Sequence, residues 1–230
     1  MTISVITPTN RQTNINVILN NFLRQSYNPK ELIILLNYDN PNELLWRNLT
    51  KKYDNISIYT MGSNISLGDC LNYGISKAEY EYIAKLDDDD YYGDAYLEEA
   101  LLTLQNKHAD IVGKSSIFIY FCDEDILGIQ RIKDNNKFVS RVSGSTLFFN
   151  KSITNIIKFK NKNLGEDLDF CKEAINKNLK IYSSDRRQYV YIRSNKSNHT
   201  WKINNDYLIR ECMKIGNKSN LEDLYRQWQV

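Results

Sequence analysis

The chain has 230 residues, of which 42% are hydrophobic and 25% are charged. This length and composition are typical of a globular protein that is large enough to bury a core of its own. The formal net charge of +2 produces no strong field, which argues against a protein built to bind nucleic acid or an anionic membrane. The four cysteines are scattered without a CxxC pair, so we expect neither a zinc site nor a disulfide framework.

The sequence contains no apolar stretch that approaches the length of a membrane span. Its opening, MTISVITPTN, lacks the basic and apolar regions of a signal peptide. We therefore expect no transmembrane segment, and we expect a cytoplasmic protein whose thiols stay reduced.

Strand-length apolar runs alternate with segments of helical periodicity through the first half of the chain. The expected strands are 3–7, 31–36, 56–60 and 80–86, and the expected helices are 14–26, 42–53, 66–78 and 94–107. Asp94 is expected to cap the last of these helices. The alternation predicts a parallel sheet with helices on both faces, in which ligands bind beyond the carboxyl ends of the strands.

The pattern changes after residue 108. The expected elements are strands within 110–121, 125–133, 143–150 and 179–184, a short strand after the polar turn DNNK, an amphipathic helix at 165–178, and two short helices from Lys202 onward. Leu168, Cys171, Ala174 and Ile175 should form the inward face of the 165–178 helix. Without a repeat or a linker, we expect a single domain over residues 1–200, divided near residue 108, and a helical tail over 201–230.

Four consecutive aspartates, Asp87 to Asp90, follow the apolar strand YIAKL. They could form a solvated acidic turn, but neighbouring carboxylates repel one another, and a bound cation would relieve that repulsion. Carboxylate oxygens suit Mg²⁺ or Mn²⁺. A calcium loop of the helix-loop-helix type does not fit, because Tyr92 occupies the position of its obligatory glycine.

Four segments together resemble the family 2 glycosyltransferases. LDDDDYYGDAYLEEA is similar to the LDxDD region of that family, and ISVITPTNR is similar to its opening VSVIIPTYNR. NISLGDCLNYGISKAEYEYIAKL and GEDLDFCKEAINKNLKI resemble two further motifs in the same order. The resemblance implies a GT-A fold, a Rossmann-like mixed sheet flanked by helices. It also implies that residues 1–108 bind a nucleotide sugar and that residues 109–200 bind the acceptor.

The resemblance further implies inverting transfer of a sugar from a nucleotide diphosphate sugar, assisted by Mn²⁺ or Mg²⁺. Asp89 is then the principal metal ligand, and Asp87 shares the ion or contacts the ribose. Asp88 and Asp90 are expected either in solvent or behind the ligating groups. Asp88 is also counted among the donor-site residues. His199 is a candidate further metal ligand or a donor to the diphosphate, although a surface histidine remains an alternative. Trp201 could stack on a sugar or simply pack.

The acceptor hydroxyl needs a base, and the resemblance assigns that role to Asp167, beside Glu166. On the residues alone, these two carboxylates could merely complement the dipole of the helix that they begin. Asp169 is a less favoured base.

The implied donor site includes residues from several segments: Thr7, Pro8, Thr9, Arg11, Asn37 or Asp39, Asn64, Gly68, Lys85, Gly144, Ser145 and Arg193. Gly68 should permit close packing, and Lys85 could contact a phosphate or extend to the surface. The second strand departs from the family pattern, since LLNYDNPN stands where V-D-D-G-S is usual. A UDP-sugar is the expected donor, but this departure leaves the nucleotide base open.

Two other functions fit the sequence less well. A sugar nucleotidyltransferase would need a glycine-rich phosphate loop after the first strand, and TPTNRQTN contains no glycine. A non-catalytic nucleotide-sugar-binding module is favoured only by the altered second-strand motif. The acceptor, whether glycan, lipid-linked sugar or protein, and the oligomeric state stay open. The Asn- and Lys-rich composition suggests a bacterial or phage genome and hence cell-surface glycan synthesis, with the inner membrane face as an alternative location.

Overall fold

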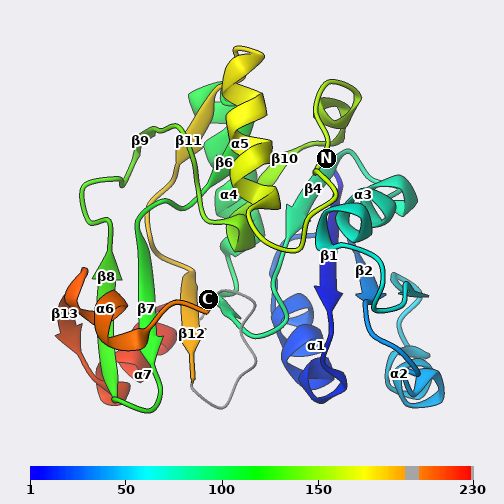
Figure 1. Ribbon diagram of the computed structural model, residues 1–230, viewed down its shortest axis with the longest axis horizontal. Coiled ribbons are helices and arrows are strands. Elements are labelled where there is room, and N and C mark those ends of the chain that lie inside the picture. The colour runs from blue at the N-terminus through cyan, green and yellow to red at the C-terminus, as the bar shows by residue number, and fades with distance from the viewer. Residues whose placement is uncertain (195–201, 229–230) are drawn as a thin grey trace.

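The computed structural model describes residues 1–194 and 202–228 (Figure 1). Its main layer is an eight-stranded mixed sheet in the order β3-β2-β1-β4-β10-β6-β11-β9. The strands are β1 (Ile3–Thr9), β2 (Lys30–Leu36), β3 (Ile56–Thr60), β4 (Tyr82–Lys85), β6 (Ile111–Gly113), β9 (Lys137–Phe138), β10 (Phe148–Asn150) and β11 (Ile181–Ser183). The first four run parallel to one another, and β10 is antiparallel to both β4 and β6. The carboxyl ends of β1, β2 and β4 therefore meet at one edge of the sheet.

A second sheet has five strands in the order β13-β8-β7-β12-β5. Its strands are β5 (Tyr91–Tyr92), β7 (Ile117–Phe121), β8 (Ile126–Gln130), β12 (Tyr189–Arg193) and β13 (Cys212–Gly216). Strands β7 and β8 form an antiparallel hairpin, and β13 from the tail adds to the outer side of β8. The tail holds the two expected helices, α6 (Asn205–Arg210) and α7 (Lys218–Gln227). It also supplies a strand that the sequence did not predict.

Helices cover both faces of the main sheet, as the alternating pattern predicts. The helices are α1 (Ile15–Leu23), α2 (Glu43–Thr50), α3 (Leu67–Lys77), α4 (Tyr96–Lys107) and α5 (Glu166–Asn176). Successive residues of β2 enter different cores: Leu32 and Ile34 pack with α1, α2 and α4, whereas Ile33 packs with α3 and α5. This two-sided burial explains why β1 and β2 read as continuous apolar runs. Within the described residues, no helix combines the length and the hydropathy needed to cross a bilayer.

Several local expectations were wrong. Strand β10 begins only at Phe148, because residues 144–146 form a 3-10 helix instead of extending the strand. Helix α4 begins after Ala95, and no side chain caps it; the backbone oxygen of Asp94 instead accepts a hydrogen bond from the amide of Ser26. In α5, Leu168 and Ile175 are exposed, and Phe170 takes the buried place between them. The helical periodicity predicted this helix correctly. Of the four residues expected to face the core, however, only Cys171 and Ala174 are buried.

Candidate active site

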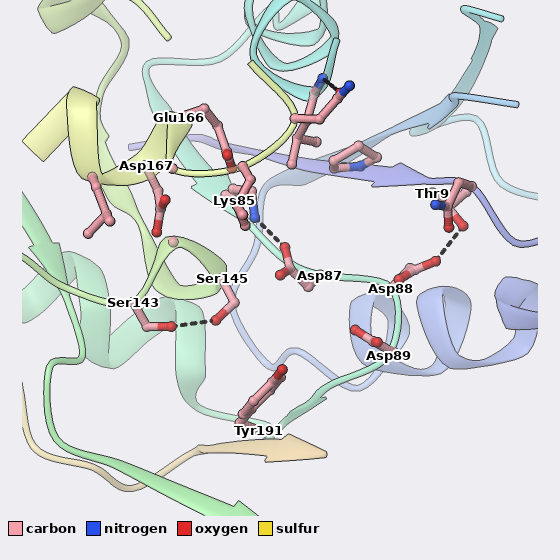
Figure 2. Close-up of a pocket in the computed structure, with 18 of the residues that line it drawn as sticks. Thr9, Lys85, Asp87, Asp88, Asp89, Ser143, Ser145, Glu166, Asp167 and Tyr191 are labelled. Carbon is pink, nitrogen blue, oxygen red and sulfur yellow. Dashed lines mark hydrogen bonds and ion pairs between the residues drawn. The ribbon is translucent and has the colours of Figure 1, made fainter. Parts of the chain in front are cut away.

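A cavity of about 760 Å³ lies where the carboxyl ends of β1, β2 and β4 meet the N-terminus of α5. The size suits a small-molecule ligand. Two groups of side chains line it, with the Asp87–Asp89 carboxylates of one group opposite Asp167 of the other (Figure 2). We call one the acidic wall: Arg11, Lys85, Asp87, Asp88 and Asp89. We call the other the α5 wall: Arg131, Arg141, Ser143, Ser145, Glu166 and Asp167.

The acidic wall begins where β4 ends. The strand stops at Lys85, so Asp87 to Asp89 lie in the turn that follows, and strand alternation does not determine where their side chains point. Lys85 is buried and forms an ion pair with Asp87. Burial lowers the pKa of Lys85, but the negative charges of Asp87 and Glu166 outweigh burial and raise the pKa to about 12. The reading of Lys85 as a surface lysine was wrong, and this cation stays charged at neutral pH.

Arg11 holds the next two aspartates. Its guanidinium pairs with Asp88, and one of its nitrogens lies 2.9 Å from Asp89 Oδ2. The hydroxyl of Thr9 donates to Asp88 at 2.5 Å. Burial and the neighbouring Asp89 raise the pKa of Asp88 to about 6, although Arg11 and Thr9 oppose the shift. Asp88 is therefore a buried carboxylate that fixes Arg11, so of its two predicted places, in solvent or behind the ligating groups, only the second fits.

Asp90 is also buried, and it connects the turn to the second sheet. It accepts hydrogen bonds from the hydroxyl of Tyr189 at 2.6 Å and from the amide of Ile192 at 3.0 Å. Burial raises the pKa of Asp90 well above its usual range. Of the two places predicted for Asp90, in solvent or behind the ligating groups, only the second fits, because β12 packs directly against the turn.

Two tyrosines link the acidic wall to the segment that carries Ser143 and Ser145. The hydroxyl of Tyr189 lies 2.6 Å from Ser145 Oγ, which is 2.9 Å from Ser143 Oγ. The hydroxyl of Tyr92 accepts from the amide of Asp87 and donates to the carbonyl of Ser145. Because both tyrosines are fully buried, these bonds fix the distance between the two walls.

The α5 wall is centred on the first turn of α5. Gly165 has a φ of +78°, a conformation that suits glycine, and it turns the chain into the helix. Glu166 is buried, and burial raises the pKa of its carboxyl. Asp167 lines the cavity against Gly144, where a Cβ atom would lie 2.5 Å from Asp167 Oδ2. The absence of a side chain at residue 144 thus makes room for the Asp167 carboxylate.

The cavity brings together most of the predicted site residues. Pro8, Thr9, Arg11, Asn37, Lys85, Asp87, Asp88, Asp89, Gly144, Ser145, Glu166 and Asp167 line it. Asn37 and not Asp39 reaches it; Asn37 also donates to the carbonyls of residues 62 and 65, while the exposed Asp39 accepts from Ser63.

Five predicted donor residues lie outside that lining: Thr7, Asp39, Asn64, Gly68 and Arg193. Gly68 has a packing role, since a Cβ atom there would come within 1.8 Å of the Lys160 carbonyl oxygen. Arg193 is buried behind the cavity, where it donates to Tyr191, Asn205 and the carbonyl of Ile203. His199 and Trp201 fall outside the described residues.

The sequence reasoning missed several lining residues: Ser115, Arg131, Arg141, Ser143 and Tyr191. All of them come from the second half of the chain, where the strands are short and mixed in direction. Two of them lay beside predicted residues, since Ser143 directly precedes Gly144 and Ser145 and Tyr191 lies two positions before Arg193.

The acidic wall can supply two carboxylate ligands to a divalent ion, but not a complete set of protein ligands. No group of three or more His, Cys, Asp or Glu side chains within residues 1–194 and 202–228 is arranged to hold a metal. However, Mg²⁺ and related ions are commonly held by one or two carboxylates together with substrate phosphates and water. Asp87 and Asp89 both line the cavity, so the wall supplies that smaller donor set.

Solved structures define the class of fold. Staphylococcus aureus TarS, residues 1–349 in complex with UDP-GlcNAc, superposes with a TM-score of 0.70 at 20% identity, over 89% of this chain and 62% of that one. The mannosyltransferase PcManGT from Pyrobaculum calidifontis, in complex with GDP-Man and Mn²⁺, gives a TM-score of 0.64 at 15% identity, over 86% and 59%. The chain therefore has the GT-A fold, as the sequence predicts.

The family model described as Glycosyl transferase family 2 matches residues 4–164. The chain belongs to this family of transferases. It is 27% identical over 176 residues to the O-antigen biosynthesis glycosyltransferase WbnJ of Escherichia coli, a match that covers 75% of this chain and 63% of WbnJ. It is 32% identical over 110 residues to the minor teichoic acid biosynthesis protein GgaB of Bacillus subtilis, covering 47% and 12%. The chain thus spans less than two thirds of the length of either relative.

Proposed function

We propose that the protein transfers a sugar, with inversion, from a nucleotide diphosphate sugar to an acceptor hydroxyl. One observation carries this proposal: a single cavity places the Asp87–Asp89 carboxylates opposite Asp167. In-line displacement at the anomeric carbon needs such an arrangement, with the leaving group stabilised on one side and the attacking hydroxyl deprotonated on the other.

On the acidic wall, Asp89 would hold Mn²⁺ or Mg²⁺, with Asp87 beside it. A divalent ion supplies charge stabilisation for the departing nucleoside diphosphate. Arg11 and Lys85 lie on the same wall and add fixed positive charge there. Arg11 forms an ion pair with Asp89 in this structure. To ligate an ion, Asp89 must therefore replace this ion pair, at least in part, with a bond to the metal.

On the α5 wall, Asp167 would accept the proton of the acceptor hydroxyl, and the buried Glu166 would support the local charge balance with Lys85. A positioned carboxylate base contributes roughly 10²- to 10⁴-fold to a rate. In this scheme residues 1–108 supply the donor site and residues 109–200 supply most of the acceptor site.

A UDP-sugar is the donor that we propose to test first, since a structural neighbour carries UDP-GlcNAc. GDP-Man in the other neighbour is the reason to include guanosine nucleotides. The names of WbnJ and GgaB support a context of bacterial cell-surface glycan synthesis. We place the reaction in the cytoplasm, or at the inner membrane face if the acceptor is lipid-linked.

The first experiment measures the melting temperature with UDP or UDP-sugars, with and without Mn²⁺ or Mg²⁺. A ligand at 100 times its dissociation constant should raise it by about 5–10 °C for a chain of this size. The shift should need the ion, disappear with a chelator, and be lost in Asp89→Ala. Asp54→Ala, which changes an exposed aspartate away from the cavity, is the matched control and should keep the shift.

Product analysis then separates the candidate functions. Release of free nucleoside diphosphate from the sugar donor supports the transferase, whereas release of pyrophosphate would indicate a nucleotidyltransferase. One structural observation favours a non-catalytic binding module. The carboxylates that would hold the ion, Asp87 and Asp89, are already paired with Lys85 and Arg11. Binding of nucleotide sugars without any turnover, across a panel of acceptors, would establish that module instead.

A further inference from the structure

Two arginines of the α5 wall, Arg131 and Arg141, line the cavity without an acidic partner. Neither lies within 4.0 Å of a carboxylate oxygen among residues 1–194 and 202–228, although the two cations of the acidic wall both do. Arg131 follows β8 with a φ of +49°, and Arg141 precedes Ser143 by two residues. The second sheet and the loop before β10 thus deliver two guanidinium groups to the same cavity.

The electrostatic neighbours of Arg131 place this pair on the side of the candidate base. Burial and the positive charge of Arg141 lower the pKa of Arg131, while Asp134 and Asp167 partly offset them. The charges that act on Arg11 are instead those of Asp88 and Asp89. Arg131 and Arg141 therefore serve a different part of the cavity from Arg11, whereas Lys85 lies between the two parts, since both Asp87 and Glu166 act on it.

Two neighbouring guanidinium groups repel each other, and partial burial strengthens that repulsion. An anion between them would relieve it. The planar guanidinium fork matches the oxygens of a phosphate group, to which it can donate two parallel hydrogen bonds. The diphosphate of the donor already has Arg11, Lys85 and the proposed ion on the acidic wall. The anion that fits Arg131 and Arg141 is therefore a second one, brought by the other substrate.

We propose that Arg131 and Arg141 form a phosphate-binding subsite for the acceptor, which carries a phosphate ester close to the hydroxyl that Asp167 deprotonates. This inference rests on the proposed glycosyl transfer. A polyol phosphate chain and a lipid-linked sugar diphosphate share the required chemistry, and they differ in what lies beyond the phosphate.

Direct binding is measured first, with glycerol 3-phosphate as the probe and glycerol as its uncharged control. In the presence of UDP and Mg²⁺, glycerol 3-phosphate should raise the melting temperature further, and glycerol should not. The added shift should be lost in the double variant Arg131→Gln/Arg141→Gln and retained in Arg47→Gln. Arg47 is an exposed arginine of α2 outside the cavity lining, so it controls for the loss of charge. An equal effect of glucuronate would overturn the assignment to phosphate.

Transfer assays then use a synthetic glycerol phosphate oligomer, a short-chain lipid-linked sugar diphosphate and a neutral oligosaccharide. We expect transfer to one of the two phosphate-bearing acceptors, which identifies the source of the phosphate. The double variant should raise KM for that acceptor by roughly 10- to 100-fold, the range for losing hydrogen bonds to a charged group. The variant Arg131→Lys/Arg141→Lys keeps both positive charges but loses the planar guanidinium groups. Its KM for the same acceptor should lie between those of the wild type and the double glutamine variant.

Two outcomes would overturn the subsite. One is equal use of the neutral oligosaccharide, and the other is loss of the UDP-dependent shift in the double variant, which would assign both arginines to the donor. Failure of the transferase itself is distinguishable, because the wild-type protein would then hydrolyse no nucleotide sugar. Hydrolysis by the wild type together with no response to glycerol 3-phosphate would reject the subsite alone.

Discussion

The two walls of the cavity handle charge differently. On the acidic wall, Asp87 pairs with Lys85, and both Asp88 and Asp89 pair with Arg11. On the α5 wall, Arg131 and Arg141 have no such partner within the described residues, and Asp167 rests against the bare backbone of Gly144. The acidic wall is a network whose members hold one another in place, whereas on the α5 wall Arg131 and Arg141 are left for a ligand to pair.

This difference has a physical consequence. Buried charges are tolerated when they are paired and hydrogen-bonded, and removing one partner is costly for the fold. Charges that face a cavity at its solvent-accessible side contribute little to stability and remain available for chemistry. Substitutions on the α5 wall should therefore affect activity first, and substitutions behind the acidic wall should affect stability first.

Asp167→Asn should produce the largest effect. It removes the candidate base while it keeps the shape of the side chain, so transfer should fall by roughly 10²- to 10⁴-fold. Steady-state rates with a nucleotide sugar and an acceptor measure this loss. Asp169→Asn is the matched control, because Asp169 lies on the same helix and pairs with Lys162. Equal losses in the two variants would remove the special role of Asp167.

Gly144→Ala should come next. The added Cβ atom would lie 2.5 Å from Asp167 Oδ2, so the carboxylate must move. A displacement of about 1 Å at a reacting group can reduce a rate by roughly 10²-fold. We expect this loss in turnover together with a lower melting temperature, since Asp167 Cβ, 2.7 Å from the added atom, must also move, and that requires a shift of the backbone. Unchanged turnover would show that the position of Asp167 is not critical.

Tyr189→Phe should have the smallest effect on chemistry and a clear effect on stability. It removes the hydroxyl that donates to the buried Asp90, and an unsatisfied buried acceptor costs about 1–3 kcal/mol. Chemical denaturation should show this decrease in the free energy of unfolding. Tyr207→Phe changes an exposed tyrosine of α6 and should cost much less. If both variants unfold alike, Asp90 does not depend on Tyr189.

Much of the donor side could be predicted from the sequence, because it consists of local motifs at the ends of regular strands. The continuous apolar runs of β1 and β2 and the helical period of α1 and α3 predicted the parallel half of the sheet. Once those strands are parallel, Pro8, Asn37 and Lys85 must lie near one edge. The resemblance at LDDDDYYGDAYLEEA added Asp87 to Asp89 to the same edge.

The sequence alone could not distribute the four aspartates among their roles. Asp87 to Asp90 are chemically identical and adjacent, and only their tertiary partners make one a cavity residue and another a buried anchor. Tyr189, which holds Asp90, lies 99 positions away along the chain. The same holds for Arg131 and Arg141, whose meeting with Asp167 depends on how short strands of the second sheet pack.

The sequence by itself determined the alternating fold, the family, and the presence of a carboxylate-rich edge, because strand and helix periods and adjacent motifs are local properties of the chain. Only the tertiary structure decided which carboxylates are buried, that Gly144 faces Asp167, and that two arginines reach the cavity without partners. Those outcomes depend on contacts between distant segments, and the energies of such contacts are set by burial and geometry that no local pattern encodes.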